Sequence, residues 1–285
     1  MTGVNGFRVA AADEPLDVSG SLLVGGDAWA ALANLPDGCA QTCVTSPPYW
    51  GLRDYGHPGQ AGLELGLGTY VDGLVGLFDQ VRRVLAPDGA LWLNLGDSYT
   101  SGTRATRGPD KRNPHRLASH RPPMPEGLKP KDLVGVPWRV AFALQDRGWF
   151  LRTEIVWRKP NAQPESVRDR PMRCHEYLFL LTPSQNYWYD MGASVDDAGR
   201  RLRSVWDLAN SNKRIVDIPH PAVFPVKLAE RCVRITSRPG DVVLDPFLGS
   251  GTTAVAAARL GRRFVGVELN PDYLGLARRR LSEGT

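Results

Sequence analysis

A stiff polar turn follows one of the buried strands that the sequence predicts. The strand is Thr42–Thr45, and the turn consists of Ser46, Pro47, Pro48 and Tyr49. Open α/β sheets place their ligand sites at the carboxyl ends of strands, which is where this turn lies. Each proline fixes φ and removes an N–H donor, so the turn is rigid and presents acceptor oxygens. The Ser46 hydroxyl and the Pro47 carbonyl could accept both hydrogens of an amino group and orient its nitrogen as a nucleophile.

Tyr49 adds a flat ring against which an extruded base could stack. The alternative for this turn, taken in isolation, is purely structural: the prolines would end a strand, and Tyr49 and Trp50 would fill the core. A second turn in the same chain argues against that alternative.

This second turn lies in residues 241–253. The segment reads as a strand ending at Asp245, a tight turn with Gly249 and Gly251, and the start of a helix. Glycines let the backbone bend and approach a ligand, and a helix N-terminus presents free N–H groups. Glu268 ends the next strand, where a carboxylate can accept hydrogen bonds from both hydroxyls of a ribose. The pair of features predicts a cofactor that contains a nucleoside.

The kind of cofactor stays open at this point. Gly249-x-Gly251-x-x-Ala254 also matches the dinucleotide fingerprint, so the loop alone allows either a methyl donor or NAD. A glycine turn that serves only helix–strand packing is the remaining alternative.

The elements that must hold these turns alternate between strands and helices, which is typical of a mostly parallel sheet covered on both faces. The sequence predicts seven strands: Leu22–Gly25, Thr42–Thr45, Ala90–Leu95, Thr153–Trp157, Tyr177–Thr182, Val242–Asp245 and Arg263–Val267. Apolar residues at helical spacing predict helices within 71–85, 137–147, 226–236 and 274–281. Pro87-Asp88-Gly89 is predicted to end the first of these helices in a turn.

Composition is that of an ordinary globular chain, with 285 residues, 42% hydrophobic, and a formal charge of +5. No apolar run is long enough to cross a membrane and no secretion signal is recognisable, so a cytoplasmic location is expected. The four cysteines lack the spacing of a metal site, and no metal is predicted. Residues 98–131 contain eight Arg and Lys and two acidic residues, so this segment has a formal charge of +6 and the rest of the chain has −1. This basic, proline-rich segment predicts a loop that contacts an acidic partner, and a merely solvated loop is the alternative.

The order of the two turns resembles a known family. Thr45-Ser-Pro-Pro-Tyr49 upstream and Asp245-Pro-Phe-x-Gly-Ser-Gly-Thr-Thr253 downstream are similar to the DNA amino-methyltransferases of the permuted, or β, group. Supporting similarity extends over Gly26-Asp27, residues 93–97, 157–161, 175–177 and 220–225. The resemblance implies a Rossmann-like class I methyltransferase fold in permuted order, formed by residues 1–285 as one domain. It also implies S-adenosylmethionine as the cofactor and a target-recognition segment at 184–220.

The resemblance implies a role for each matching residue. Ser46, Pro47, Pro48 and Tyr49 would be the catalytic turn. The donor would be held by Asp27, Phe224, Asp245, Phe247, Gly249, Gly251, Thr252 and Glu268. Among these, Asp27 would contact the adenine of the donor. Asp27 is also a candidate helix N-cap, so both roles stay open. The expected DNA contacts are Arg104, Arg107, Lys111, Arg112, Arg116, Lys129, Lys131 and Lys159.

The implied reaction is direct methyl transfer to the exocyclic amino group of a base flipped out of double-stranded DNA. Ser46 favours cytosine N4, because the family's cytosine enzymes mostly carry Ser there, and adenine N6 is the alternative. A homodimer and a cognate restriction endonuclease are expected as further partners. Two other classes of protein remain alternatives: an NAD-linked dehydrogenase and a non-catalytic DNA-binding module. A methyltransferase that acts on RNA instead of DNA is a variant of the main hypothesis.

Overall fold

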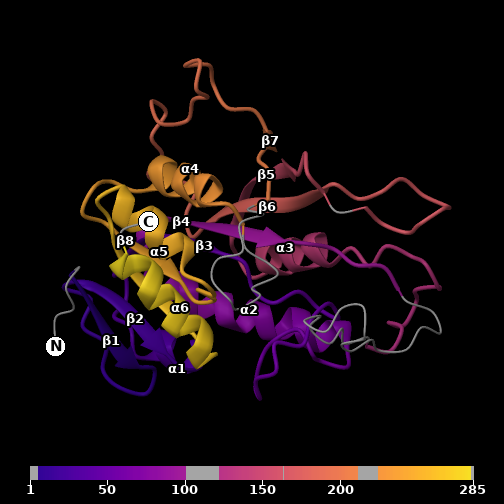
Figure 1. Ribbon diagram of the computed structural model, residues 1–285, viewed down its shortest axis with the longest axis horizontal. Coiled ribbons are helices and arrows are strands. Elements are labelled where there is room, and N and C mark those ends of the chain that lie inside the picture. Colours follow the sequence, from indigo (N-terminus) through magenta and orange to yellow (C-terminus); the bar gives the residue numbers. More distant parts are fainter. Residues whose placement is uncertain (1–5, 101–121, 163, 211–223, 284–285) are drawn as a thin grey trace.

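A nine-stranded sheet forms the centre of the protein. The computed structural model describes residues 6–100, 122–162, 164–210 and 224–283. The strands are β1 (Phe7–Ala11), β2 (Ser21–Gly25), β3 (Ala40–Thr45), β4 (Leu85–Leu95), β5 (Phe150–Arg158), β6 (His175–Thr182), β7 (Val205–Asp207), β8 (Val242–Asp245) and β9 (Arg263–Glu268). Their order in the sheet is β1-β2-β9-β8-β3-β4-β6-β5-β7 (Figure 1).

The direction of the strands places their carboxyl ends together. The six strands from β1 to β4 in sheet order run parallel, β6 runs antiparallel to β4 and β5, and β7 pairs in parallel with β5. The ends of β3, β4, β5, β8 and β9 and the beginning of β6 therefore lie at one edge, here called the site edge. The expected α/β fold is confirmed, with the seven predicted strands at its centre and β1 and β7 added at its two sides.

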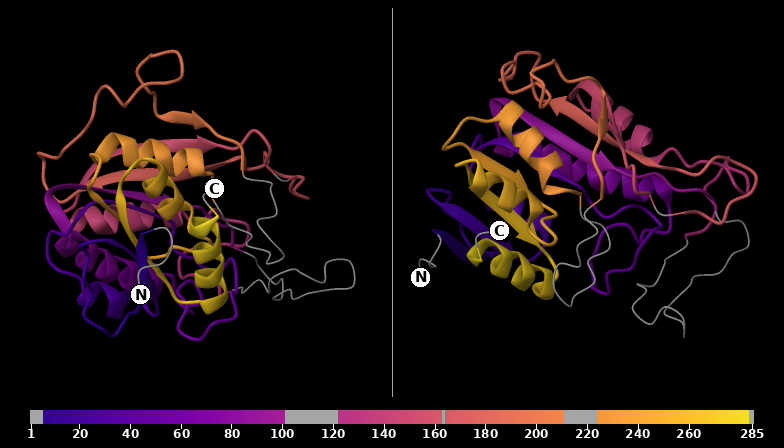
Figure 2. Two further views of the ribbon diagram at one scale, coloured as in Figure 1. Left: turned by 60° about the vertical axis from the view of Figure 1, so that its left-hand side comes forward. Right: turned by 45° about the horizontal axis from the view of Figure 1, so that its top comes forward.

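Helices cover both faces of this sheet (Figure 2). They are α1 (Ala28–Ala33), α2 (Leu67–Val84), α3 (Val136–Asp146), α4 (Val226–Thr236), α5 (Thr252–Arg259) and α6 (Pro271–Ser282). The apolar faces of α1, α2 and α3 form one core with the sheet, and those of α4, α5 and α6 form another on the opposite face. Burial of two apolar faces explains why the central strands read as nearly continuous hydrophobic runs. Within the described residues, no helix has the length and apolarity needed to span a membrane.

Strand β4 begins earlier than the sequence predicts. Pro87-Asp88-Gly89 does not form a separate turn, because β4 already pairs with β3 at Leu85 and pairs again from Ala90 onward. The shift in register between these pairs accommodates the proline, which cannot donate to the ladder.

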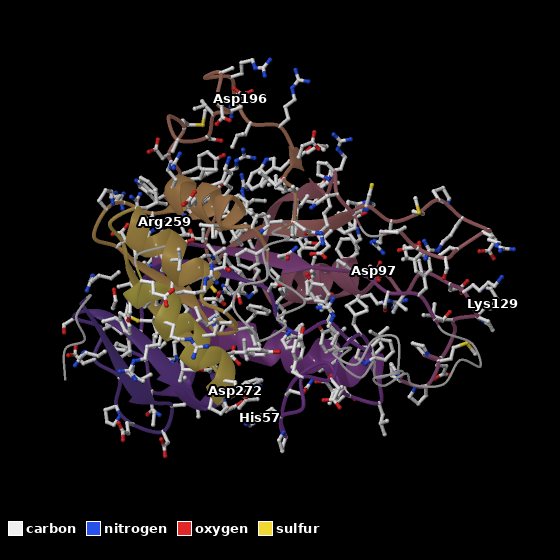
Figure 3. All side chains as sticks on the ribbon, in the orientation of Figure 1. His57, Asp97, Lys129, Asp196, Arg259 and Asp272 are labelled. Carbon is white, nitrogen blue, oxygen red and sulfur yellow. The ribbon has the colours of Figure 1, made fainter. Side chains whose placement is uncertain are left out.

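The segment predicted to recognise the target takes a course that the sequence did not reveal. Trp188 N–H donates to the Asp88 carbonyl and Asp190 N–H to the Ile235 carbonyl, both at the sheet edge opposite the site edge. The chain then passes beside α4, and Figure 3 shows Asp196 on a different side of the molecule from Asp97. Residues 205–207 form β7, and Trp206, which lies inside the predicted recognition segment, is buried against Trp92. Of the described part of 184–220, only Asp207 and Leu208–Asn210 lie at the site edge.

Candidate active site

The two turns singled out in the sequence meet at the site edge. Strands β3 and β8 are neighbours, with Thr42 opposite Val243 and Cys43 opposite Leu244. One step further along, the Thr45 hydroxyl donates to the Asp245 carboxylate at 2.7 Å. The Thr253 hydroxyl, in the first turn of α5, donates to the Val44 carbonyl at 3.1 Å. The end of the strand before the catalytic turn is thus bonded directly to both sides of the glycine loop.

The Ser46–Tyr49 turn, which is predicted to be catalytic and is called the catalytic turn below, is held by a chain of hydroxyl hydrogen bonds. Ser46 Oγ donates to the Tyr49 hydroxyl at 3.2 Å, and this hydroxyl lies 2.8 Å from Glu176 Oε2 and 3.1 Å from Asn94 Oδ1. Because Tyr49 gives its proton to one of these acceptors, its oxygen is left to accept from Ser46. The lone pairs of Ser46 Oγ are then available for an amino group. The Tyr70 hydroxyl fixes the same turn by donating to the Pro48 carbonyl at 2.9 Å.

A partly buried cation balances the carboxylate at the end of this chain. Lys159 forms an ion pair with Glu176 and lies 4.3 Å from the centre of the Trp157 ring. Burial raises the pKa of Tyr49 well above its usual value, and the charge of Glu176 adds to the effect. Tyr49 therefore stays a protonated donor across the physiological range. The structure places Lys159, which was expected to contact DNA, inside this network.

The glycine loop has the left-handed backbone that only glycine adopts without strain. Gly249 and Gly251 have φ of 55° and 85°, and a Cβ on Gly251 would lie 2.9 Å from the side chain of Ala277. Arg280 of α6 reaches back to this loop and donates to the Ser250 carbonyl at 2.5 Å and to its hydroxyl at 2.9 Å. No side chain caps α5, so the N–H groups of its first turn face the site edge.

Two carboxyl groups beside the loop have raised pKa values. Burial raises the pKa of Asp245 to about 6, against the opposing hydrogen bonds from Thr253, Thr45 and Phe247. Burial also raises the pKa of Glu268 to about 7, although its carboxylate accepts the N–H groups of Asn270 at 2.8 Å and Gly249 at 2.7 Å. Perturbed carboxyl groups at the edge of a sheet are characteristic of a functional site.

The remaining expected donor contacts lie around the same edge. Asp27 is exposed and caps α1, accepting the N–H groups of Trp29 and Ala30 at 3.0 and 3.2 Å. The N-cap alternative is thus observed, and a contact with adenine stays a prediction. Thr252 begins α5, Phe247 follows Asp245 in the loop, and Phe224 is buried in the core formed with α4 and α5.

Most of the expected DNA contacts cannot be placed. Arg104, Arg107, Lys111, Arg112 and Arg116 lie outside the described residues. Lys129 and Lys131 have side chains that are 81% and 80% exposed, and Lys131 pairs with Asp169 at 2.5 Å. An antiparallel bridge joins Tyr99 to Leu133, so the two ends of the basic segment are neighbours in space.

Several residues of the site were not singled out by sequence reasoning. They are Arg280, together with Arg53 and Tyr55, which follow the Ser46–Tyr49 turn. Asn94 and Glu176 lie in the segments 93–97 and 175–177, which were matched to the family without a role for either residue. For Arg280 a signal existed: it shares the inward helical face of Tyr273, Ala277 and Leu281 in a predicted helix, which is an unusual position for an arginine.

Known proteins provide an independent comparison. The profile of the DNA methylase family for N6 and N4 amino-methyltransferases matches residues 40–279. The Type II methyltransferase M.Cfr9I of Citrobacter freundii is 52% identical over 272 residues, which cover 94% of this chain and 90% of that protein. The Type II methyltransferase M.SmaI of Serratia marcescens is 53% identical over 265 residues, covering 91% of this chain and 90% of that one.

Solved structures show the same architecture. TTHA0409 of Thermus thermophilus, described as a DNA modification methylase and solved with S-adenosylmethionine, is 30% identical. It superposes with a TM-score of 0.65 over 92% of this chain and 93% of that one. The cytosine-N4-specific PvuII DNA methyltransferase has a TM-score of 0.70 at 21% identity, over 94% of each chain, and supports the fold alone.

The fold is that of a class I methyltransferase, and the Ser-Pro-Pro-Tyr turn precedes the glycine loop in its sequence. The chain belongs to the N6/N4 family of DNA methylases. This membership replaces the NAD-linked dehydrogenase that the glycine loop alone had allowed.

Proposed function

We propose that this protein is a site-specific methyltransferase that transfers the methyl group of S-adenosylmethionine to N4 of a cytosine flipped out of double-stranded DNA. The observation that carries the proposal is the bond between Thr45 and Asp245, which fixes an amine-orienting turn beside a nucleoside-binding loop. Family membership supports the DNA methyltransferase reaction, and Ser46 at the first position of the turn supports cytosine over adenine.

The residues of the donor site fit S-adenosylmethionine. Glu268 has acceptor capacity beyond its two backbone bonds and stands at the end of β9, where a ribose would lie. The uncapped first turn of α5 presents N–H groups to polar atoms of the donor. When bound, the donor supplies an electrophilic methyl group on a sulfonium.

The protein contributes orientation of the amine. Ser46 Oγ and the Pro47 carbonyl accept the two amino hydrogens, which directs the nitrogen lone pair toward the donor loop. Tyr49 keeps Ser46 in the acceptor role, because its own proton goes to Glu176 or Asn94. Asn94 is held in the matching orientation by donating from Nδ2 to the Tyr177 carbonyl at 3.0 Å. The nitrogen gains a methyl group and releases one proton. Ser46 Oγ takes this proton as it gives its own to the Tyr49 hydroxyl, and Tyr49 gives its own to the Glu176 carboxylate, which is left protonated. Positioning and hydrogen bonding of this kind supply the rate enhancement without a covalent intermediate.

The DNA is proposed to bind across the site edge. The connection between β5 and β6, residues 159–174, lies at this edge and carries Arg168, Arg170 and Arg173. It is fastened to the basic segment, since Arg170 stacks on the Tyr99 ring at 3.7 Å and Asp169 pairs with Lys131. Target recognition is therefore proposed for 159–174 together with 98–131, and for the end of the 184–220 segment rather than its beginning. The expected homodimer, cognate endonuclease and cytoplasmic location remain parts of this proposal.

Methylation of unmodified DNA tests the proposal directly. Purified protein is incubated with double-stranded DNA and deuteromethyl-labelled S-adenosylmethionine, and the nucleosides are analysed by mass spectrometry. We expect labelled N4-methyldeoxycytidine, and a loss of roughly 10²-fold or more in turnover for Ser46→Ala, comparable to removing one oriented hydrogen bond in other active sites. Tyr49→Phe, which keeps the ring, is expected to lose less.

Different products would change the conclusion in defined ways. N6-methyldeoxyadenosine would overturn the choice of base and keep the reaction. Label in RNA but not DNA would overturn the substrate. No label from a protein that binds DNA would support the non-catalytic DNA-binding module, while undiminished turnover by Ser46→Ala would remove Ser46 from the site.

A further inference from the structure

A folded loop follows the catalytic turn directly. Its ends are joined by Gly51 N–H donating to the Gly62 carbonyl at 2.9 Å. Inside it, the Gln60 side chain accepts from Tyr55 N–H at 2.7 Å and donates to the Arg53 carbonyl at 3.2 Å. Residues 51–62, here called the arch, are therefore held in shape by hydrogen bonds among themselves.

The arch reaches across to the other side of the donor site. The Tyr55 ring meets the Tyr273 ring of α6 edge to face, with centroids 6.4 Å apart and planes at 82°. Since Tyr49 precedes the arch and α6 follows Glu268, the arch connects the catalytic turn with the region proposed for the ribose.

The arginine of the arch belongs to the same group of interacting charges as the two carboxylates of the site. Burial raises the pKa of the Tyr55 hydroxyl, and the nearby Arg53 guanidinium lowers it. The negative charges of Glu268 and Glu176 raise the same pKa. Arg53 and Glu268 also act on the hydroxyl of Tyr273. The Arg53 guanidinium thus stands two residues before the tyrosine that contacts α6 and four residues after Tyr49.

One end of this guanidinium has no partner within the protein. Arg53 Nη1 is buried, and among the described residues it makes no hydrogen bond. A buried unpaired donor is costly, and in native structures such groups commonly await a ligand. A guanidinium selects planar anions such as carboxylates and phosphates, which it can bind with two parallel hydrogen bonds.

We propose that Arg53 binds the carboxylate of the donor's methionine part and that the arch closes the donor site. The inference rests on the proposed donor, which carries one anionic group and two cationic ones. Only the anionic group suits a guanidinium, and Glu268 on the other side of the site suits the neutral ribose hydroxyls. A phosphate of the DNA backbone is the competing anion.

Two ligands separate these possibilities by calorimetry. S-adenosylhomocysteine carries the carboxylate, whereas 5′-methylthioadenosine keeps the adenosine and sulfur and lacks the amino acid. We expect Arg53→Met to weaken S-adenosylhomocysteine by ~10- to 100-fold, the effect of losing a hydrogen-bonded charge, and to leave 5′-methylthioadenosine unchanged. Arg53→Lys should fall between the two. Arg200→Met, which removes an exposed arginine paired with Asp196, is the matched control and should change neither affinity.

The other outcomes overturn the inference. Equal weakening of both ligands would mean that Arg53 only supports the arch. Unchanged S-adenosylhomocysteine affinity, with weaker DNA binding, would assign Arg53 to a phosphate. If the unaltered protein bound neither ligand, the donor itself would be wrong, which is a distinct failure. Thermal melting of each variant shows whether the fold is retained.

Discussion

At the scale of single residues, Glu268 combines two properties that oppose each other. Its position at the end of β9 suits it to a ribose, yet burial raises its pKa to about 7. A protonated carboxyl accepts fewer hydrogen bonds than a carboxylate. In the donor-free protein the folded state therefore holds the proton more tightly than the unfolded state, whose carboxyl has a pKa near 4.5. The contribution of this group to folding stability falls as the pH rises from about 4.5 to about 7.

Ligand affinity should follow the opposite trend. We expect 5′-methylthioadenosine to bind about ten-fold more tightly at pH 8 than at pH 6, as Glu268 ionises through its pKa of about 7. This ligand has no carboxylate or amine that titrates in the range, so the change belongs to the protein. Glu268→Gln should bind with little dependence on pH. A dependence that persists in this variant would point to Asp245, whose pKa is about 6.

The proposed site residues show what a sequence can and cannot predict at this scale. Ser46 and Asp245 could be proposed because one follows a recognisable strand and the other ends one. For Glu176, only the segment 175–177 was matched to the family, because its bond to Tyr49 depends on which strands become neighbours. Arg53 lies in a loop without a periodic pattern and was not predicted. Nothing in the local sequence around Glu176 indicates that an antiparallel β6 brings it to the hydroxyl of Tyr49.

At the scale of elements, the start of α3 depends on a side chain from β4. Gly135, the residue before α3, offers no side-chain cap. Asp97 Oδ1, just beyond β4, instead accepts the N–H groups of Gly135 at 2.9 Å, Val136 at 3.0 Å and Ser98 at 2.9 Å. This carboxylate connects the end of a strand to a helix that begins 39 residues later.

Replacing Asp97 should therefore destabilise the fold. We expect Asp97→Ala to lower the free energy of unfolding by about 1–3 kcal/mol, because three N–H groups lose their acceptor. Asp97→Asn keeps one acceptor oxygen and should lose clearly less. Urea unfolding monitored by circular dichroism measures both. Equal losses in the two variants would mean that the negative charge, which lies 3.8 Å from Arg173, matters more than the capping bonds.

Elements with strong local patterns were predicted well, and those defined by tertiary pairing were not. The buried central strands are long apolar runs, and helices such as α2 and α4 have clear apolar faces, so periodicity was sufficient. Strand β7 has three residues, and its middle residue, Trp206, is buried in the core. A single sequence does not indicate this packing. The start of β4 was missed because proline within a strand is tolerated only at an irregularity in pairing.

At the scale of the whole molecule, the basic segment begins and ends beside the site edge. The net charge of +5 arises from residues 98–131, whose two ends meet at the Tyr99–Leu133 bridge beyond β4. Arginines at 200, 201 and 203, in contrast, belong to the segment that passes beside α4. Charge placement thus predicts that DNA contacts the basic residues of 98–131 rather than Arg200, Arg201 and Arg203.

The salt dependence of DNA binding tests this placement. We expect the triple variant Arg104→Gln, Arg107→Gln, Lys111→Gln to reduce the slope of log affinity against log salt by about three, since each lost phosphate contact removes about one. The matched variant Arg200→Gln, Arg201→Gln, Arg203→Gln removes the same charge and should leave the slope nearly unchanged. Fluorescence anisotropy with a labelled duplex measures both slopes. Equal reductions would show only a general effect of net charge, as a solvated loop would produce.

The bond between Thr45 and Asp245 joins residues 200 positions apart. During synthesis on the ribosome, the amine-orienting turn emerges roughly 10–40 s before the loop that must face it, at about 5–20 residues per second. A nascent chain therefore cannot methylate anything until nearly all of it has been translated. Truncated products of interrupted translation would lack activity even where they keep the Ser-Pro-Pro-Tyr sequence, and such pairing of distant segments is also expected to make folding slow.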